Sequence, residues 1–317
     1  MHSFARRTLS ALLLAGAISG TLFAAPFAYV PNEKSGTLSV IDTANDEVVG
    51  QLPGGSAPRG VAVSPDGTRL YVSDPKANGL VVVDPRERRI LRTIDLGAAP
   101  EGVYMSADGR WVAAATETAN TVVFVDTRSD TKAFTVPTRG KNPEHAVFSR
   151  DGRWVYVSAE DADTVDVIDT EKRAQVAEIK VARRPRGIAF TADGQRAYVA
   201  CELDSTVFAI SVPDHKVIAS IKAGNFSNGV TLRPDDARVY VSNGRDGTVS
   251  VIDTKENRVL ETVAVGQRPW NMAITPDGRK LYVANGRSNS VSVIDTASNR
   301  KLRDIAVGEA PWGVVVR

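Results

Sequence analysis

Short runs of alternating or β-branched apolar residues, separated by polar turn residues, follow one another from residue 27 to the end of the chain. Residues 269–310 show the unit most clearly. Its four apolar runs are Asn271–Thr275, Lys280–Ala284, Val291–Ile294 and Leu302–Val307. The first two runs are separated by the turn pair Asp277-Gly278, and the others by loops rich in Gly, Ser and Asn. This pattern predicts four antiparallel strands in a single sheet.

The same unit recurs throughout the chain. One landmark is a proline before the first run, at Pro58, Pro100, Pro143, Pro185, Pro269 and Pro311, with Ser227 in its place once. The steps between these landmarks are 42, 43, 42, 42, 42 and 42 residues. A second landmark is the turn aspartate at Asp66, Asp108, Asp151, Asp193, Asp235 and Asp277. A third lies five residues later, at Tyr71, Ala113, Tyr156, Tyr198, Tyr240 and Tyr282. A four-stranded unit with this period predicts an all-β fold, the β-propeller.

Counting the units predicts seven blades. Six complete units run from Pro58 to Ala310, and the two ends of the chain supply the seventh. Residues 27–57 contain its second to fourth strands, while residues 311–317 contain an isolated first strand. Pairing these ends would close the ring and remove the open sheet edge. We therefore expect residues 26–317 to form one seven-bladed β-propeller domain, and a monomer because the ring leaves no free edge.

The first 25 residues differ from the repeats. Arg6 and Arg7 precede an uncharged stretch, 8–25, that is rich in Leu and Ala. This layout predicts a cleaved signal peptide over residues 1–25 and a periplasmic or secreted protein. The apolar part is short for a membrane span, and none is expected elsewhere in the chain.

The charge balance argues against some partners. The chain carries 39 basic and 37 acidic residues, so its formal net charge is only +2. A nearly neutral chain has no basic field for nucleic acid or anionic membranes. Cys201 is its only cysteine, which excludes an intramolecular disulfide, and no C-x-x-C-H haem motif is present. We expect no cofactor.

The second runs carry a family resemblance. They read Tyr-Val-Ser-Asn at 240–243, Tyr-Val-Ala-Asn at 282–285 and Tyr-Val-Pro-Asn at 29–32. The chain thus resembles the YVTN family of β-propeller repeats over nearly all of its mature length. Its signal peptide and seven repeats are most similar to exported propellers associated with pyrroloquinoline-quinone (PQQ)-dependent alcohol catabolism. The resemblance implies the fold strongly and the function weakly.

Candidate functional residues are those that break the repeat at the mouth of the central channel. The residue after each proline landmark is polar, charged or aromatic: Arg59, Glu101, Glu144, Arg186, Asn228, Trp270 and Trp312. At the next position glycine is the rule, with His145 and Asn271 as exceptions. The loop after the second strand should reach the same face, and it carries Glu117, Glu160 and Glu202. We call this predicted polar ring the funnel.

Three functions remain open for the funnel. The favoured prediction is a non-catalytic exported propeller that binds a periplasmic protein or small molecule there, as an accessory of quinoprotein alcohol metabolism. The alternative is an enzyme of lactonase or lyase type, with His145 as general base beside Glu144 and Glu101. The third is a structural or surface propeller with a merely solvated channel mouth. One histidine gives no tetrahedral zinc set, so no metal site is predicted. The basic run 183–186 is expected to be a solvated loop.

Overall fold

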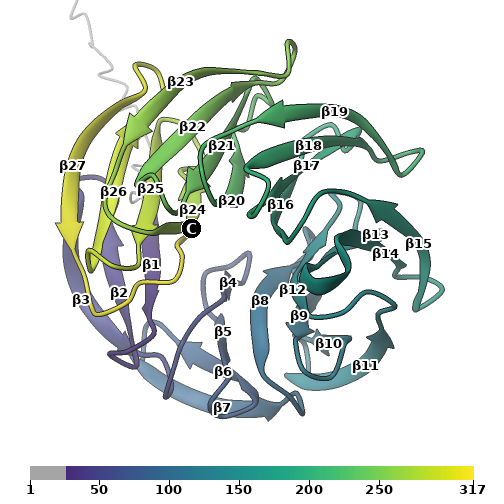
Figure 1. Ribbon diagram of the computed structural model, residues 1–317. Helices are drawn as coiled ribbons and strands as arrows, with labels where there is room; N and C mark the ends of the chain where they lie inside the picture. Colours follow the sequence, from purple (N-terminus) through teal and green to yellow (C-terminus); the bar gives the residue numbers. More distant parts are fainter. Residues whose placement is uncertain (1–25) are drawn as a thin grey trace, which may run out of the picture.

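The computed structural model describes residues 26–317, which form seven four-stranded antiparallel sheets around a central channel (Figure 1). The seven-bladed fold is therefore confirmed, while the predicted signal peptide lies outside the described residues. Blade 1 consists of β28 (Val315–Val316), β1 (Phe27–Asn32), β2 (Thr37–Asp42) and β3 (Glu47–Pro53). Blade 2 consists of β4 (Val61–Val63), β5 (Leu70–Asp74), β6 (Gly79–Asp84) and β7 (Arg89–Asp95). Blade 3 consists of β8 (Pro100–Met105), β9 (Trp111–Thr116), β10 (Thr121–Asp126) and β11 (Thr131–Pro137).

The other four are blade 4 with β12 (Pro143–Phe148), β13 (Trp154–Ala159), β14 (Thr164–Asp169) and β15 (Ala174–Lys180), blade 5 with β16 (Pro185–Phe190), β17 (Arg196–Cys201), β18 (Thr206–Ser211) and β19 (Lys216–Lys222), blade 6 with β20 (Ser227–Leu232), β21 (Arg238–Asn243), β22 (Thr248–Asp253) and β23 (Arg258–Ala264), and blade 7 with β24 (Pro269–Ile274), β25 (Lys280–Asn285), β26 (Ser290–Asp295) and β27 (Arg300–Ala306). One 3-10 turn, η1 (Glu160–Ala162), follows β13. In this part of the chain no helix is long and apolar enough to cross a membrane.

The two ends of the chain close the ring within blade 1. Ala28 and Tyr29 of β1 pair antiparallel with Val316 and Val315 of β28. A further bridge joins Asn32 to Pro311. The predicted first strand of this blade is confirmed, although only two of its residues have strand geometry.

The turn residues act as their chemistry predicts. Gly67 and Gly278, which follow turn aspartates, have φ angles of 68° and 71°, a region that glycine enters without strain. Where the pair reads Asp235-Asp236, Asp236 adopts the same conformation with φ of 59°. The aspartate that ends the third strand in every blade but blade 5, where Ser211 stands instead, caps the next turn. The carboxylate of Asp84, for example, accepts hydrogen bonds from the backbone N–H groups of Arg86 and Glu87.

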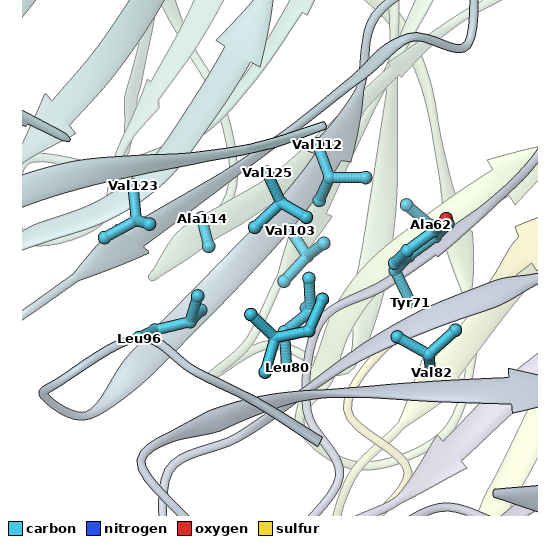
Figure 2. Close-up of a cluster of buried hydrophobic side chains, with 11 residues drawn as sticks. Ala62, Tyr71, Leu80, Val82, Leu96, Val103, Val112, Ala114, Val123 and Val125 are labelled. Atoms are coloured by element: carbon cyan, nitrogen blue, oxygen red, sulfur yellow. The ribbon is translucent and has the colours of Figure 1, made fainter. Parts of the chain in front are cut away.

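The core lies between neighbouring blades. Figure 2 shows the contact of blades 2 and 3, where Tyr71 packs among Ala62, Val82 and Val112. The Tyr71 hydroxyl donates to the carboxylate of Asp130, in the outer turn of the next blade, at 2.7 Å. Tyr71 therefore joins adjacent blades by its ring and by its hydroxyl.

The innermost strands position the funnel. Each blade turns its first strand toward the channel and its fourth toward solvent (Figure 1), and β27 is exposed at six of its seven residues. The first strands approach closely: a Cβ added at Gly60 or Gly187 would lie 2.6 Å from the carbonyl oxygen of Glu101 or Asn228 in the next blade. Glycine at this position lets the neighbouring backbones meet, and it brings the preceding side chains together at one end of the channel.

Candidate active site

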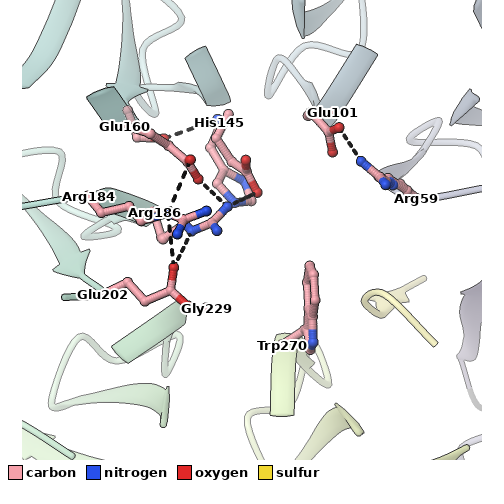
Figure 3. Close-up of polar contacts among 12 residues, drawn as sticks. Arg59, Glu101, His145, Glu160, Arg184, Arg186, Glu202, Gly229 and Trp270 are labelled. Atoms are coloured by element: carbon pink, nitrogen blue, oxygen red, sulfur yellow. Dashed lines mark hydrogen bonds and ion pairs between the residues drawn. The ribbon is translucent and has the colours of Figure 1, made fainter. Parts of the chain in front are cut away.

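The funnel residues fall into charged groups on different walls of the channel mouth. In Figure 3, Arg59 and Glu101 lie on one side, opposite His145, Glu160 and Arg186, with Trp270 on a third side. The structure thus brings together most of the residues singled out from the sequence, because they occupy the same register in neighbouring blades.

Arg186, at the start of β16, is the centre of the larger group. Its guanidinium lies 2.5 Å from Glu144 of blade 4 and 2.9 Å from Glu202 of its own blade, and it also pairs with Glu160. Arg184 adds contacts of 3.3 Å to Glu160 and to Glu202. The side chain of Arg186 is 7% exposed and those of its three carboxylate partners 1–8%. The buried charge of Arg186 is thus surrounded by carboxyl partners, as a buried ion must be.

Arg59 holds the smaller group. Its guanidinium lies 2.9 Å from Glu33 of blade 1 and also pairs with Glu101 of blade 3. Arg59 remains 30% exposed at its side chain, whereas Glu101 is 4% exposed. The guanidinium therefore reaches the channel while its carboxylate partner is buried behind it.

The carboxyl pKa values in the funnel are driven apart. Burial raises the pKa of Glu101 to about 8, with repulsion from Glu144 adding to the shift and Arg59 opposing it. Burial and the charge of Glu144 likewise raise the pKa of Glu160 to about 8. Burial alone would raise the pKa of Glu144, but the Arg186 guanidinium and His145 outweigh it, so this pKa is lowered. At neutral pH the funnel therefore holds Glu144 as a carboxylate beside carboxylic acids.

His145, in β12, is fully buried. Its Nδ1 lies 2.7 Å from the Tyr104 hydroxyl. Its Nε2 has no hydrogen-bond partner within residues 26–317 and lies 4.0 Å from Glu144. Burial lowers the pKa of His145 to about 4, so the imidazole is neutral at pH 7. The predicted neighbourhood of His145 and Glu144 is therefore present, but this imidazole is a weak base.

The aromatic wall continues from His145. Its ring centroid lies 5.9 Å from that of Trp312, and Trp312 lies 5.9 Å from Trp270. Asn271 sits beside Trp312, with a buried Nδ2 that has no hydrogen-bond partner among the described residues. Asn228 is buried on the same ring, but among residues 26–317 no ion pair or side-chain hydrogen bond joins it to the charged groups.

A cavity of about 430 Å³ runs along the channel between the first strands. It meets the funnel at Arg59, Tyr104, Asn271 and Trp312. This volume suits a small molecule rather than a folded partner. Over residues 26–317, no group of three or more His, Cys, Asp and Glu side chains is arranged to hold a metal ion.

Some members of the site were missed or misplaced by the sequence analysis. Tyr104 was overlooked, although it stands where the other first strands carry Ala, Val or Thr, and that exception was a usable signal. Arg184 lies in a loop with its side chain 40% exposed, as expected, but it also contacts two buried carboxylates, which was not foreseen. Glu160 and Glu202 were expected at the funnel from their position after the second strand. They were given no role, because sequence spacing does not reveal which cation each carboxyl group contacts.

Comparisons with known proteins agree with this architecture. The sequence model of the family "Lactonase, 7-bladed beta-propeller" matches residues 99–176 and 169–312. A search of curated proteins found no match. Among solved structures, hydrazine synthase of Kuenenia stuttgartiensis is similar with a TM-score of 0.79 and 21% identity, over 90% of this chain and 99% of that one. A candidate 6-phosphogluconolactonase from Bacteroides uniformis has a TM-score of 0.77 and 20% identity, over 92% and 99%. One from Bacteroides fragilis has 0.76 and 19%, over 94% and 99%. Identities this low show the fold alone.

These findings correct the favoured functional prediction. The expectation of a non-catalytic binding propeller, and of a chain that is not an enzyme, is wrong: the lactonase match favours the enzymatic alternative instead. The physical reason for the error is that the repeat landmarks specify blades and turns, whereas the acid–base character of Glu101 and Glu144 arises only when neighbouring blades bury them together. With more than half of its residues matched, the chain belongs to the lactonase family of seven-bladed β-propellers.

Proposed function

We propose that the funnel is the active site of a hydrolase that opens lactone rings with water. The observation that carries this proposal is the pair Glu101 and Glu144. These two carboxyl groups influence each other electrostatically, yet one has a pKa of about 8 and the other a lowered pKa. Adjacent carboxyl groups with separated pKa values are suited to acid and base roles in one reaction.

Each group has a defined task in this proposal. The Glu144 carboxylate accepts a proton from water as the water oxygen bonds to the lactone carbonyl carbon. The Arg59 guanidinium, which borders the cavity, stabilises the negative charge that develops on the carbonyl oxygen. The ring C–O bond then breaks, and the Glu101 carboxylic acid donates its proton to the departing alkoxide. The product is an open hydroxy acid. The proton taken up by Glu144 is then returned through solvent to the Glu101 carboxylate, which restores both groups for the next cycle.

His145 and Tyr104 are positioning residues in this scheme. The neutral imidazole borders Glu144, and its orientation is fixed by the 2.7 Å contact to Tyr104. The neighbouring rings of Trp270 and Trp312, tilted by 48° to each other, form an apolar wall against which a lactone ring can lie.

The charge pattern favours an uncharged lactone over a phosphorylated one. The four guanidiniums of the network, on Arg59, Arg184, Arg186 and Arg268, each pair with at least one glutamate. A phosphate group would have to compete with those carboxylates for its cations. We therefore propose a small neutral lactone as the substrate class.

The test is hydrolysis of δ-valerolactone and 6-phosphogluconolactone by the purified protein, followed as acid release. We expect turnover of the neutral lactone and a loss of about 10²- to 10⁴-fold in Glu144→Gln and Glu101→Gln, the usual contribution of a positioned acid or base. Glu256→Gln, at an exposed turn, is the matched control and should retain full activity. Absence of turnover by the wild type, or full activity in Glu144→Gln, would refute the proposal.

The narrower resemblance remains a proposal too. The Tyr-Val-x-Asn strands support membership of the YVTN repeat group, and the layout of residues 1–25 supports export to the periplasm or beyond. Detection of the mature protein in a periplasmic fraction, with a new N-terminus near residue 26, would test the second point.

A further inference from the structure

Blade 3 departs from the tyrosine landmark that joins the other blades. Tyr71, Tyr156 and Tyr282 each direct the hydroxyl to a residue in the outer turn of the next blade, namely Asp130, His215 and Asp46. Figure 2 shows how Tyr71 occupies the space between blades 2 and 3. In blade 3 the same position is Ala113, so the ring and its hydroxyl are missing from the contact with blade 4.

Neighbouring residues replace only part of that ring. Phe124, in β10, stands where the other blades carry Val or Ala, and it stacks on Phe134 with centroids 4.4 Å apart. Phe124 also meets Phe148 of blade 4 edge to face at 6.0 Å. Next to these rings a pocket of about 550 Å³ remains between the two blades, lined also by Trp111, Arg150 and Arg173. It opens at the Asp-Gly turns, at the end of the blades opposite the funnel.

The outer-turn residue has changed together with the tyrosine. Asp130, His215 and Asp46 can each accept a hydrogen bond from a phenol, but the equivalent residue facing Ala113 is Arg173, a cation that only donates hydrogen bonds. Arg173 lies over the ring of Phe134 at 4.6 Å. The equivalent outer-turn residue that faces blade 1 is also an arginine, Arg88, but its guanidinium donates a hydrogen bond to the Gln51 carbonyl. The pocket in blade 3 therefore combines an aromatic floor with a cation at the place where a hydroxyl would lie.

The other charges at the rim leave this cation available. The carboxylates of Asp108 and Asp151 accept hydrogen bonds within their own turns, from Ser106 and Ser149 respectively, and Glu171 is exposed. Within residues 26–317 neither Arg150 nor Arg173 forms an ion pair with a carboxylate. Two exposed guanidiniums thus stand over a pocket whose floor is built of phenylalanine and tryptophan rings.

We propose that this pocket is a second ligand site, separate from the funnel, which binds a small aromatic carboxylate of the benzoate type. The aromatic ring lies in the pocket between blades 3 and 4 and packs on Phe124 and Trp111. The carboxylate accepts charge-assisted hydrogen bonds from Arg173 and Arg150. The site is formed because Ala113 and Arg173 occur together between blades 3 and 4.

Calorimetric titration of the purified protein with benzoate tests the proposal. Saturable binding is expected, and it should weaken by about tenfold or more in Arg173→Gln, which keeps much of the side-chain volume but loses the charged donor. The double variant Ala113→Tyr/Phe124→Val restores the pattern of the other blades and should lose binding to a similar extent. Its melting temperature reports whether it folds; if it does not, Arg173→Gln decides.

Two probes of similar size check the chemistry. The neutral p-cresol and the cation benzylamine should both bind more weakly than benzoate, because neither has a carboxylate for the guanidiniums. No saturable binding of benzoate, unchanged binding in Arg173→Gln, or tighter binding of benzylamine would overturn the proposal. Lactone hydrolysis should persist in Arg173→Gln, so the benzoate-binding result does not depend on whether the funnel is an active site.

Discussion

Replacing Glu160 by glutamine should flatten the dependence of stability on pH. The ordinary pKa of a glutamate is 4.5, whereas burial and the charge of Glu144 raise that of Glu160 to about 8 in the folded protein. Between these values the folded state keeps a proton that the unfolded state has lost. The contribution of protonated Glu160 to the unfolding free energy is therefore fully present below about pH 4.5 and is lost as the pH rises through about 8. The unfolding free energy falls over this range by up to about 1.4 kcal/mol per pH unit.

Glutamine stays neutral at every pH, so Glu160→Gln lacks this titration. We expect the unfolding free energy of the wild type to fall more steeply than that of the variant between about pH 5 and 8, by up to about 1.4 kcal/mol per pH unit. Urea denaturation at several pH values measures this difference without the ionic screening that guanidinium salts add. The exposed variant Glu256→Gln should follow the wild type. Parallel curves for the wild type and Glu160→Gln would refute the assigned protonation of the funnel.

Three other predictions concern the funnel and the ring. If Glu101 is the acid, kcat/KM for lactone hydrolysis should fall as the pH rises through about 8, where its carboxyl group loses the proton, and a flat pH–rate profile would exclude that role. Tyr104→Phe removes the partner of a fully buried histidine nitrogen and should cost about 1–3 kcal/mol of unfolding free energy in urea titrations; no loss would show that the contact is dispensable. Deleting residues 311–317 removes β28 and buried Trp312, so the unfolding midpoint should drop by more than in any of the single variants above, and an unchanged midpoint would contradict closure by these residues.

Much of the fold could be predicted because the sequence of each blade specifies its own strands and turns. The Asp-Gly turns, the alternating strands and the 42-residue period are all local, and the register of one blade predicts the register of the next. The turn geometry persists even where glycine is absent, since Asp236 adopts the positive φ that glycine has elsewhere. Closure of the ring was also predictable, since residues 27–57 lack one strand and residues 311–317 supply one.

The chemistry of the funnel was less accessible to sequence reasoning. Which charged side chains would meet could be inferred from their ring positions, but their pKa values depend on burial and on ions from adjacent blades. Arg184 illustrates the difficulty, because its basic neighbours suggested a solvated loop while Glu160 and Glu202 hold it beside the buried group. Ala113 was visible as an exception, yet the pocket beside it depends on Phe124 and Arg173, which lie on other strands.

The closure of blade 1 also sets an order of events during synthesis. Blades 2 to 7 each consist of contiguous residues and can form as soon as their own segment has been translated, whereas β1 waits for Val315 and Val316 at the very end of the chain. The entropy of joining such distant segments exceeds that of a single blade by only about 2 kcal/mol, since it grows with the logarithm of the separation. Closure is therefore delayed mainly because residues 315 and 316 have not yet been synthesised, and not by the entropy of joining the two segments. Until the ribosome releases the last residues, the edge of β1 stays open to pairing with other chains, so prematurely terminated products are the species most prone to aggregate.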